Sequence, residues 1–278
     1  MEIREYDTLD RFVEMQSNLR ALLEYRDHGR KSIELRVQRW ATPFGLLPLA
    51  MYADENSMDI SYGRNSDPVK RYLRNIYFPK GATQISELRE TNYLPLSKLS
   101  VDFGDDYLTR YEDMILDNIS DEGIRSSFQN SLKYLTSEIV TNIKEHAETD
   151  CYWIMSQYWP KSNTCEIVIA DAGVGYLGSY VGTPFEVDSH EEAIMNAIRG
   201  NSSKNDVERG TGIPSVIKIF CEGYGGCVLI MSGDRLLFME GERNVFYPLE
   251  VDWGGVFFGI RFELSVVNAL AYLAGNFF

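Results

Sequence analysis

The sequence predicts an α+β protein in which helices cover one face of a mixed sheet, preceded by a small α/β module. Two observations predict this class. In the second half, a long helical pattern precedes two strand patterns, a loop, another helix and three more strand patterns. In about the first 80 residues, strand and helix patterns alternate over short distances. The 278 residues favour about two domains, placed at 1–100 and 128–278 with a connecting segment at 101–127.

The first module begins with a predicted helix at residues 8–27, where apolar residues recur at helical spacing. The alternation over Ser32–Val37 is typical of a half-buried strand. A short apolar helix, a strand and a helix with proline in its first turn are predicted next, at residues 43–49, 58–62 and 67–78. Residues 79–104 mix Pro, Gly and Ser, and we predict no regular element there.

The second module is more regular. A helix is predicted from Asp121 or Ser126 to Ala147, because it has an apolar stripe at helical spacing. Further helices are predicted at residues 191–199 and 212–221. Strands are predicted at residues 151–158, 164–170, 226–232, 235–240 and 256–264.

The composition limits the partners. The formal net charge is −14 and the sequence pI is about 4.7. Binding to nucleic acids or to an anionic membrane depends on Lys and Arg, so we expect neither. The cysteines form no C-x-x-C pair, and no apolar run of membrane-spanning length occurs. We therefore expect a soluble protein of a reducing compartment, the cytoplasm.

Three polar residues recur along the long predicted helix. Glu138, Asn142 and His146 are spaced four residues apart, so they project from one helix face. Such a row is usually a solvated surface. These residue types also allow another interpretation, because a carboxylate can deprotonate water and an amide oxygen can bind Mg²⁺.

A glycine-containing turn follows a strongly apolar predicted strand. The strand ends in Asp171-Ala172-Gly173-Val174-Gly175. A carboxylate at a strand end can accept hydrogen bonds from an amino group, such as adenine N6, and glycines allow close backbone approach to a ligand. The same glycines fit G-x-G-x-x-G, but a dinucleotide site needs a helix to open there, and residues 176–189 show no helical stripe. No P-loop motif occurs.

A third motif, Gly210-Thr211-Gly212, precedes an apolar predicted helix. Free amides at a helix start can bind phosphate, although an ordinary junction between loop and helix also uses glycine. Lys204 lies in the polar segment just upstream and could reach a terminal phosphate.

Together, in this order and spacing, the three motifs resemble the GHKL ATP-binding fold of gyrase B subunits, histidine kinase catalytic domains and anti-sigma-factor serine kinases. Residues 138–147 are similar to the N-box, in its anti-sigma-kinase version, and Asp171–Gly175 to the D-x-G-x-G adenine box. Gly210–Gly212 resembles the last glycine box, and residues 176–209 correspond to the ATP lid. The resemblance covers roughly residues 128–266 and implies a two-layer α/β sandwich.

The resemblance implies roles for single residues with ATP and Mg²⁺ as cofactors. Glu138 would polarise the attacking water or hydroxyl, Asn142 would bind Mg²⁺, and Asp171 would bind adenine N6. The residues implied to contact the nucleotide are Asn142, His146, Asp171, Gly173, Gly175, Lys204, Gly210, Thr211 and Gly212. The family often has Thr after a glycine in the last strand, whereas here Gly255 is followed by Val256.

The N-terminal module resembles STAS-like domains of the anti-anti-sigma type through residues 31–47. Phosphorylatable members have a Ser before the glycine that starts the helix, and this chain has Phe44. The resemblance therefore implies a docking or dimerisation element, with a regulatory protein partner or a homodimer, and not a phosphate acceptor.

Three functions remain open from the sequence. The protein is an ATP hydrolase, a protein serine kinase of the anti-sigma type, or a non-catalytic ATP sensor. Glu138 favours turnover, because a pure binder needs no base. A histidine autokinase is disfavoured, since His28 is the upstream candidate and the glycine that follows it indicates a helix end.

Overall fold

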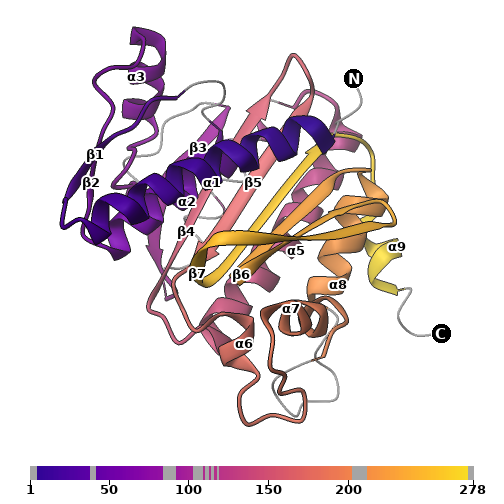
Figure 1. The fold of residues 1–278 in the computed structure, drawn as a ribbon. Helices are drawn as coiled ribbons and strands as arrows, with labels where there is room; N and C mark the ends of the chain where they lie inside the picture. The colour runs from indigo at the N-terminus through magenta and orange to yellow at the C-terminus, as the bar shows by residue number, and fades with distance from the viewer. Residues whose placement is uncertain are drawn as a thin grey trace.

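The computed structural model describes residues 5–37, 42–83, 92–102, 109, 113, 116–117, 119–201 and 212–274. At its centre lies a five-stranded antiparallel sheet in the order β3-β4-β5-β7-β6 (Figure 1). The strands are β3 (Tyr93–Ser100), β4 (Cys151–Trp159), β5 (Thr164–Asp171), β6 (Cys227–Glu240) and β7 (Arg243–Glu263). The predicted α+β class is confirmed. The predicted mixed character of this sheet is wrong, because short hairpin turns join β4 to β5 and β6 to β7, which makes the neighbours antiparallel.

One face of the sheet is covered by α5 (Glu122–His146), α7 (His190–Ile198) and α8 (Gly212–Ile217). The start of α5 is capped by Asp121, whose side chain accepts a hydrogen bond from the Ile124 N–H at 2.9 Å. The buried side of α5 carries the predicted apolar stripe, which consists of Leu132, Leu135, Ile139 and Ile143. Three further residues are buried on it, namely Phe128, Ser131 and Thr136. This packing leaves the neighbouring polar row of α5 half-buried, outside the apolar core.

The opposite face is covered by α1 (Glu5–Asp27) and α2 (Pro43–Glu55), with α1 running diagonally across the strands in Figure 1. In α2, Phe44 lies edge-on to Phe257 of β7, with ring centroids 6.3 Å apart. A Cβ on Gly259 would lie 2.7 Å from the Phe44 ring, so the glycine makes room for it. Residues on both sides of the predicted boundary near residue 100 thus share one apolar cluster.

A smaller unit lies at one end of the molecule. Strands β1 (Ser32–Glu34) and β2 (Asp59–Ser61) pair in parallel, and α3 (Asp67–Asn75) follows directly (Figure 1). Leu73 of α3 is fully buried, whereas Arg71 and Arg74 are exposed. No helix in the described part of the chain combines the length and apolar character that are needed to cross a membrane.

Several elements differ from the prediction. The edge strand β3 was not predicted, and the two strands predicted at 226–240 form the single strand β6, bulged around Gly233. Strand β7 starts well before residue 256, and a short helix, α6 (Gly175–Ser179), opens at Gly175, where no helix was predicted. After α8, the backbone forms a π-helical turn, η2 (Lys218–Gly223), and α9 (Ala269–Ala274) ends the described residues.

Candidate functional site

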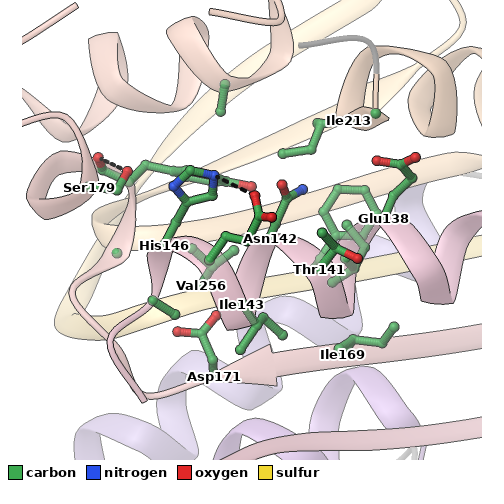
Figure 2. Close-up of a pocket in the computed structure, with 18 of the residues that line it drawn as sticks. Glu138, Thr141, Asn142, Ile143, His146, Ile169, Asp171, Ser179, Ile213 and Val256 are labelled. Carbon is green, nitrogen blue, oxygen red and sulfur yellow. Dashed lines mark hydrogen bonds and ion pairs between the residues drawn. The ribbon is translucent and has the colours of Figure 1, made fainter. Parts of the chain in front are cut away.

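A cavity of about 320 Å³ opens between α5, α6, α8, the end of β5 and the interior of β7 (Figure 2). It brings together residues that are far apart in the sequence. From α5 come Glu138, Asn142 and His146, and from the end of β5 comes Asp171 (Figure 2). The other lining residues are Ile139, Thr141, Ile143, Glu145, Ala147, Ile169, Gly175, Tyr176, Ser179, Tyr180, Ala197, Gly200, Asn201, Gly212, Ile213, Pro214, Val256 and Phe258.

The polar row of α5 points into this cavity and not into bulk solvent. Glu138, Asn142 and His146 are each half-buried, and Figure 2 shows them side by side along the helix. Burial raises the pKa of the Glu138 carboxyl above its ordinary value. His146 Nε2 lies 3.8 Å from Glu145 Oε2, which also belongs to the lining. The row therefore offers a carboxylate of increased basicity next to an amide and an imidazole.

Asp171 is the deepest polar group of the site, with 2% of its surface exposed. Burial raises its pKa to about 6, while hydrogen bonds from the N–H groups of Gly173 and Val256 act in the opposite direction. The Gly173 N–H donates to Asp171 Oδ1 at 2.8 Å. At neutral pH the group is an ionised carboxylate that faces the cavity beside the apolar residues Ile169 and Val256. A hydrogen bond from a ligand N–H group to this carboxylate would contribute strongly to the free energy of binding.

Glycines allow the chain to approach these groups closely. A Cβ on Gly173 would lie 1.9 Å from the Ala147 carbonyl oxygen, and a Cβ on Gly212 would lie 2.1 Å from Glu138 Oε2. Gly175 has φ +67° and Gly255 has φ +82°, a region that favours glycine. A Cβ on Gly255 would also meet the Asp171 carbonyl oxygen at 2.1 Å. Gly255 therefore belongs to the site, although we did not predict a site role for it.

The segment between α6 and α7 is held by its own hydrogen bonds. The Tyr180 hydroxyl donates to the Asn201 carbonyl oxygen at 2.6 Å, and the Asn201 side-chain amide donates to Asn196 Oδ1 at 3.0 Å. Asn196 in turn donates to the Phe185 carbonyl oxygen at 3.1 Å. Tyr176, Tyr180 and Asn201 are lining residues that the sequence analysis missed, because these contacts are tertiary and leave no local motif.

The dinucleotide interpretation fails on the topology. Although α6 opens at Gly175, it has only five residues, and β5 has antiparallel neighbours on both sides. A dinucleotide-binding unit needs a parallel strand–helix–strand crossover at this point. The G-x-G-x-x-G match is therefore coincidental.

Three predicted site residues, Lys204, Gly210 and Thr211, lie outside the described residues, so their roles stay predictions. Gly173 lies at the site through its bond to Asp171 but is not part of the lining. The described lining residues include three carboxylates and one histidine, and none of these described residues is Lys or Arg. Within the described part of the chain, no group of three His, Cys, Asp or Glu side chains is arranged to hold a metal ion.

Searches against protein-family models, curated proteins and solved structures find no match to this chain.

Proposed function

We propose that the cavity binds Mg-ATP and that the protein uses the nucleotide through hydrolysis or through regulation of a partner protein. The observation that carries the proposal is Asp171, a buried carboxylate at the end of β5, in one cavity with Glu138 and Asn142 of α5. The finer fold we propose is the GHKL sandwich, formed by α5, α7, α8 and the sheet. The resemblance of the three motifs supports this assignment.

The base of the ligand is proposed to be adenine. The adenine amino group would donate a hydrogen bond to the Asp171 carboxylate, and its flat ring would lie against apolar lining residues such as Ile169 and Val256. Guanine carries a carbonyl oxygen at the matching ring position, which would face the carboxylate with like partial charge. Val256 contributes its backbone N–H to Asp171, so the absence of a threonine hydroxyl leaves this part of the site intact.

Mg²⁺ is proposed to accompany the phosphates. Among the lining residues that the structure describes, no Lys or Arg neutralises them, and Glu138 adds a further negative charge. Asn142 has the amide oxygen that Mg²⁺ accepts, and Mg²⁺ is commonly held by few protein ligands together with phosphate oxygens. The lack of a three-residue cluster in the described chain fits such an ion, which arrives with the nucleotide. ATP binding should therefore depend on Mg²⁺.

Turnover is proposed to depend on Glu138. Water would attack the γ-phosphorus, the bond to the β–γ bridging oxygen would break, and Glu138 would take the proton of the nucleophile. With a serine hydroxyl of a partner in place of water, the same step would be protein phosphorylation. If Glu138 has no such role, the protein is a nucleotide sensor.

The partner and the cellular location that we propose rest on the resemblance to the GHKL and STAS-like families. We propose a regulatory protein partner and a cytoplasmic location, in line with the four free cysteines of the chain. The N-terminal residues, proposed as STAS-like, include Phe44, which is buried against β7 and carries no hydroxyl.

The proposal is tested by calorimetric titration of the full chain with ATP and with GTP, each with and without Mg²⁺. We expect ATP to bind only with Mg²⁺ and GTP to bind at least about tenfold more weakly. Asp171→Asn presents a donor to the adenine amino group and should abolish binding, whereas Asp59→Asn, an exposed site on β2, should not. Equal binding of both nucleotides, or full binding by Asp171→Asn, would refute the adenine assignment.

Turnover is measured on the same proteins with labelled ATP, alone and with candidate partners. Free phosphate that disappears in Glu138→Ala identifies a hydrolase, and label on a partner protein identifies a kinase. Nucleotide binding with equal background rates in wild type and Glu138→Ala identifies a sensor.

A further inference from the structure

Charge is distributed unevenly along this acidic chain. Residues 30–80 carry nine Lys or Arg and five Asp or Glu, a net charge of +4. Because the whole chain has a formal charge of −14, all other residues together carry −18. A division of this size between two parts of one chain indicates an electrostatic interaction surface.

The positive charge gathers around β1, β2 and α3 in a surface that we call the basic tip. It consists of Arg36, Arg64, Lys70, Arg71 and Arg74. All four arginines are exposed, and Lys70 is half-buried.

A hydrogen bond between a backbone N–H and a side chain joins the two segments that carry Arg36 and Arg64. The Val37 N–H donates to Asn65 Oδ1 at 2.8 Å, which brings the segment after β1 beside the segment after β2. Helix α3 starts immediately afterwards and buries Leu73, so Arg71 and Arg74 remain on its exposed side.

Two of the carboxylates within this unit, Glu34 and Asp67, already have partners. Glu34 accepts hydrogen bonds from the Ser61 hydroxyl and, at 2.7 Å, from the Arg64 N–H. Asp67 lies 2.7 Å from Lys70 Nζ. The arginines therefore present excess positive charge to a partner, in a side-chain geometry that matches carboxylates bidentately.

A complementary surface lies at the opposite end of the molecule, between α6 and α7 (Figure 1). We call residues 181–192 the acidic loop, because this segment has four carboxylates and no Lys or Arg. Its carboxylates, Glu186, Asp188, Glu191 and Glu192, are all exposed. Two large apolar side chains, Val181 and Phe185, are 68% and 37% exposed in the same segment. An apolar centre with charged neighbours is typical of a protein interface.

The charges favour a second copy of the chain over other anionic partners. A nucleic acid or a lipid surface extends beyond the basic tip and would meet the acidic remainder of the protein within a Debye length of about 8 Å. The acidic loop is a compact anionic surface of limited extent. It also offers Val181 and Phe185, which need an apolar contact that a phosphate backbone does not provide.

We propose that copies of this chain associate head to tail, with the basic tip of one copy against the acidic loop of the next. The two surfaces differ, so each contact leaves one tip and one loop unoccupied, and repetition produces short open chains.

Sedimentation velocity over a range of protein concentrations tests the proposal. We expect concentration-dependent assemblies at about 0.1 M salt that dissociate at about 1 M salt, where the Debye length falls from about 10 Å to about 3 Å. The tip-reversed variant, Arg71→Glu with Arg74→Glu, and the loop-reversed variant, Asp188→Lys with Glu191→Lys, should each associate about tenfold or more weakly. Arg125→Glu with Lys161→Glu changes the net charge as the tip reversal does, at positions outside the basic tip, and should associate like the wild type.

Mixing the two reversed variants gives the sharpest outcome. The intact loop of the tip-reversed protein should pair with the intact tip of the loop-reversed protein and stop at a 1:1 complex. Thermal unfolding verifies that every variant is folded. A wild type that is monomeric at every concentration overturns the proposal, as does association that survives both single reversals. Binding of the tip to double-stranded DNA or anionic vesicles without self-association would assign it to those partners instead.

Discussion

At the scale of single residues, the surroundings of Asp171 act on its ionised form in two opposite ways. Its burial penalises the ionised form, and two backbone N–H groups keep that form accessible near neutral pH. The protein thus holds a buried charged acceptor in the cavity, beside apolar residues such as Ile169 and Val256, at a cost in stability. Such a cost is typical of residues kept for binding and not for folding.

Lowering the pH through about 6 should weaken ATP binding, because the protonated Asp171 no longer accepts freely. The unfolding free energy of the ligand-free protein should change in the opposite direction. The folded pKa of Asp171 is raised, so its contribution to stability is present near the unfolded pKa of 3.8 and lost as pH rises through about 6. The change is at most about 3 kcal/mol. Calorimetry and urea unfolding from pH 4 to pH 8 measure both, and Asp171→Asn, which should not bind ATP, should remove the trend in stability.

Gly212→Ala should reduce turnover while leaving the fold intact. The added methyl group would occupy the position of the Glu138 carboxylate, which can move aside at small cost because it ends a flexible side chain. We expect at least about a tenfold loss of ATP turnover, since a base displaced by about 1 Å is a poor one. Gly254→Ala is the matched control, because a Cβ there meets nothing within 4 Å. Unchanged turnover in Gly212→Ala would contradict a role for Glu138.

At the scale of elements, the contact between α2 and the sheet is stronger than apolar packing alone. The carboxylate of Glu166, fully buried on β5, accepts a hydrogen bond from the Phe44 N–H at the start of α2 at 2.7 Å. Its second oxygen accepts from Arg261 of β7 at 3.2 Å. A charged group of the sheet therefore stabilises the start of the helix, where the dipole favours an anion.

Arg261→Met should destabilise the protein by about 3–5 kcal/mol, because it leaves the Glu166 charge buried without its cation. Combining it with Glu166→Leu removes the charge and should recover part of that loss. The check is chemical denaturation of the two single variants and the double variant. Purely additive losses would show that the two side chains are not coupled.

Local sequence patterns predicted most of the helices and strands and the site residues that lie on them. They did not predict features that depend on contacts between residues far apart in the sequence. The row of Glu138 on α5 was predictable because helical periodicity is local. The edge strand β3 was not, since Pro95 and polar residues interrupt its alternation. The contact between Tyr180 and Asn201 joins residues 21 positions apart and leaves no sequence signal.

At the scale of the whole molecule, the sheet has an apolar surface on both faces. The apolar sequence of α2 indicated burial but not which surface it covers, so its place on the sheet could not be predicted. Val168, Leu229 and Phe257 of the sheet lie in one cluster with α1 and α2. The N-terminal helices thus cover apolar residues of the sheet that would otherwise be exposed to water.

A fragment of residues 92–278 should aggregate or bind a hydrophobic dye, because it exposes the face that α1 and α2 cover. The full chain should unfold in one cooperative transition, observed alike by tryptophan fluorescence and circular dichroism. A soluble fragment with its own sharp transition would show instead that the C-terminal part folds alone.

The position of β7 has a consequence for the order of events during synthesis. It is the last strand of the chain, yet it lies between β5 and β6 in the sheet. While the ribosome is still producing residues 243–263, β5 lacks a neighbour on one side and β6 has none, so both keep open edges. Chaperone demand should therefore be high until residues 243–263 have been synthesised, and nascent chains stalled before residue 243 should be more sensitive to protease than released ones.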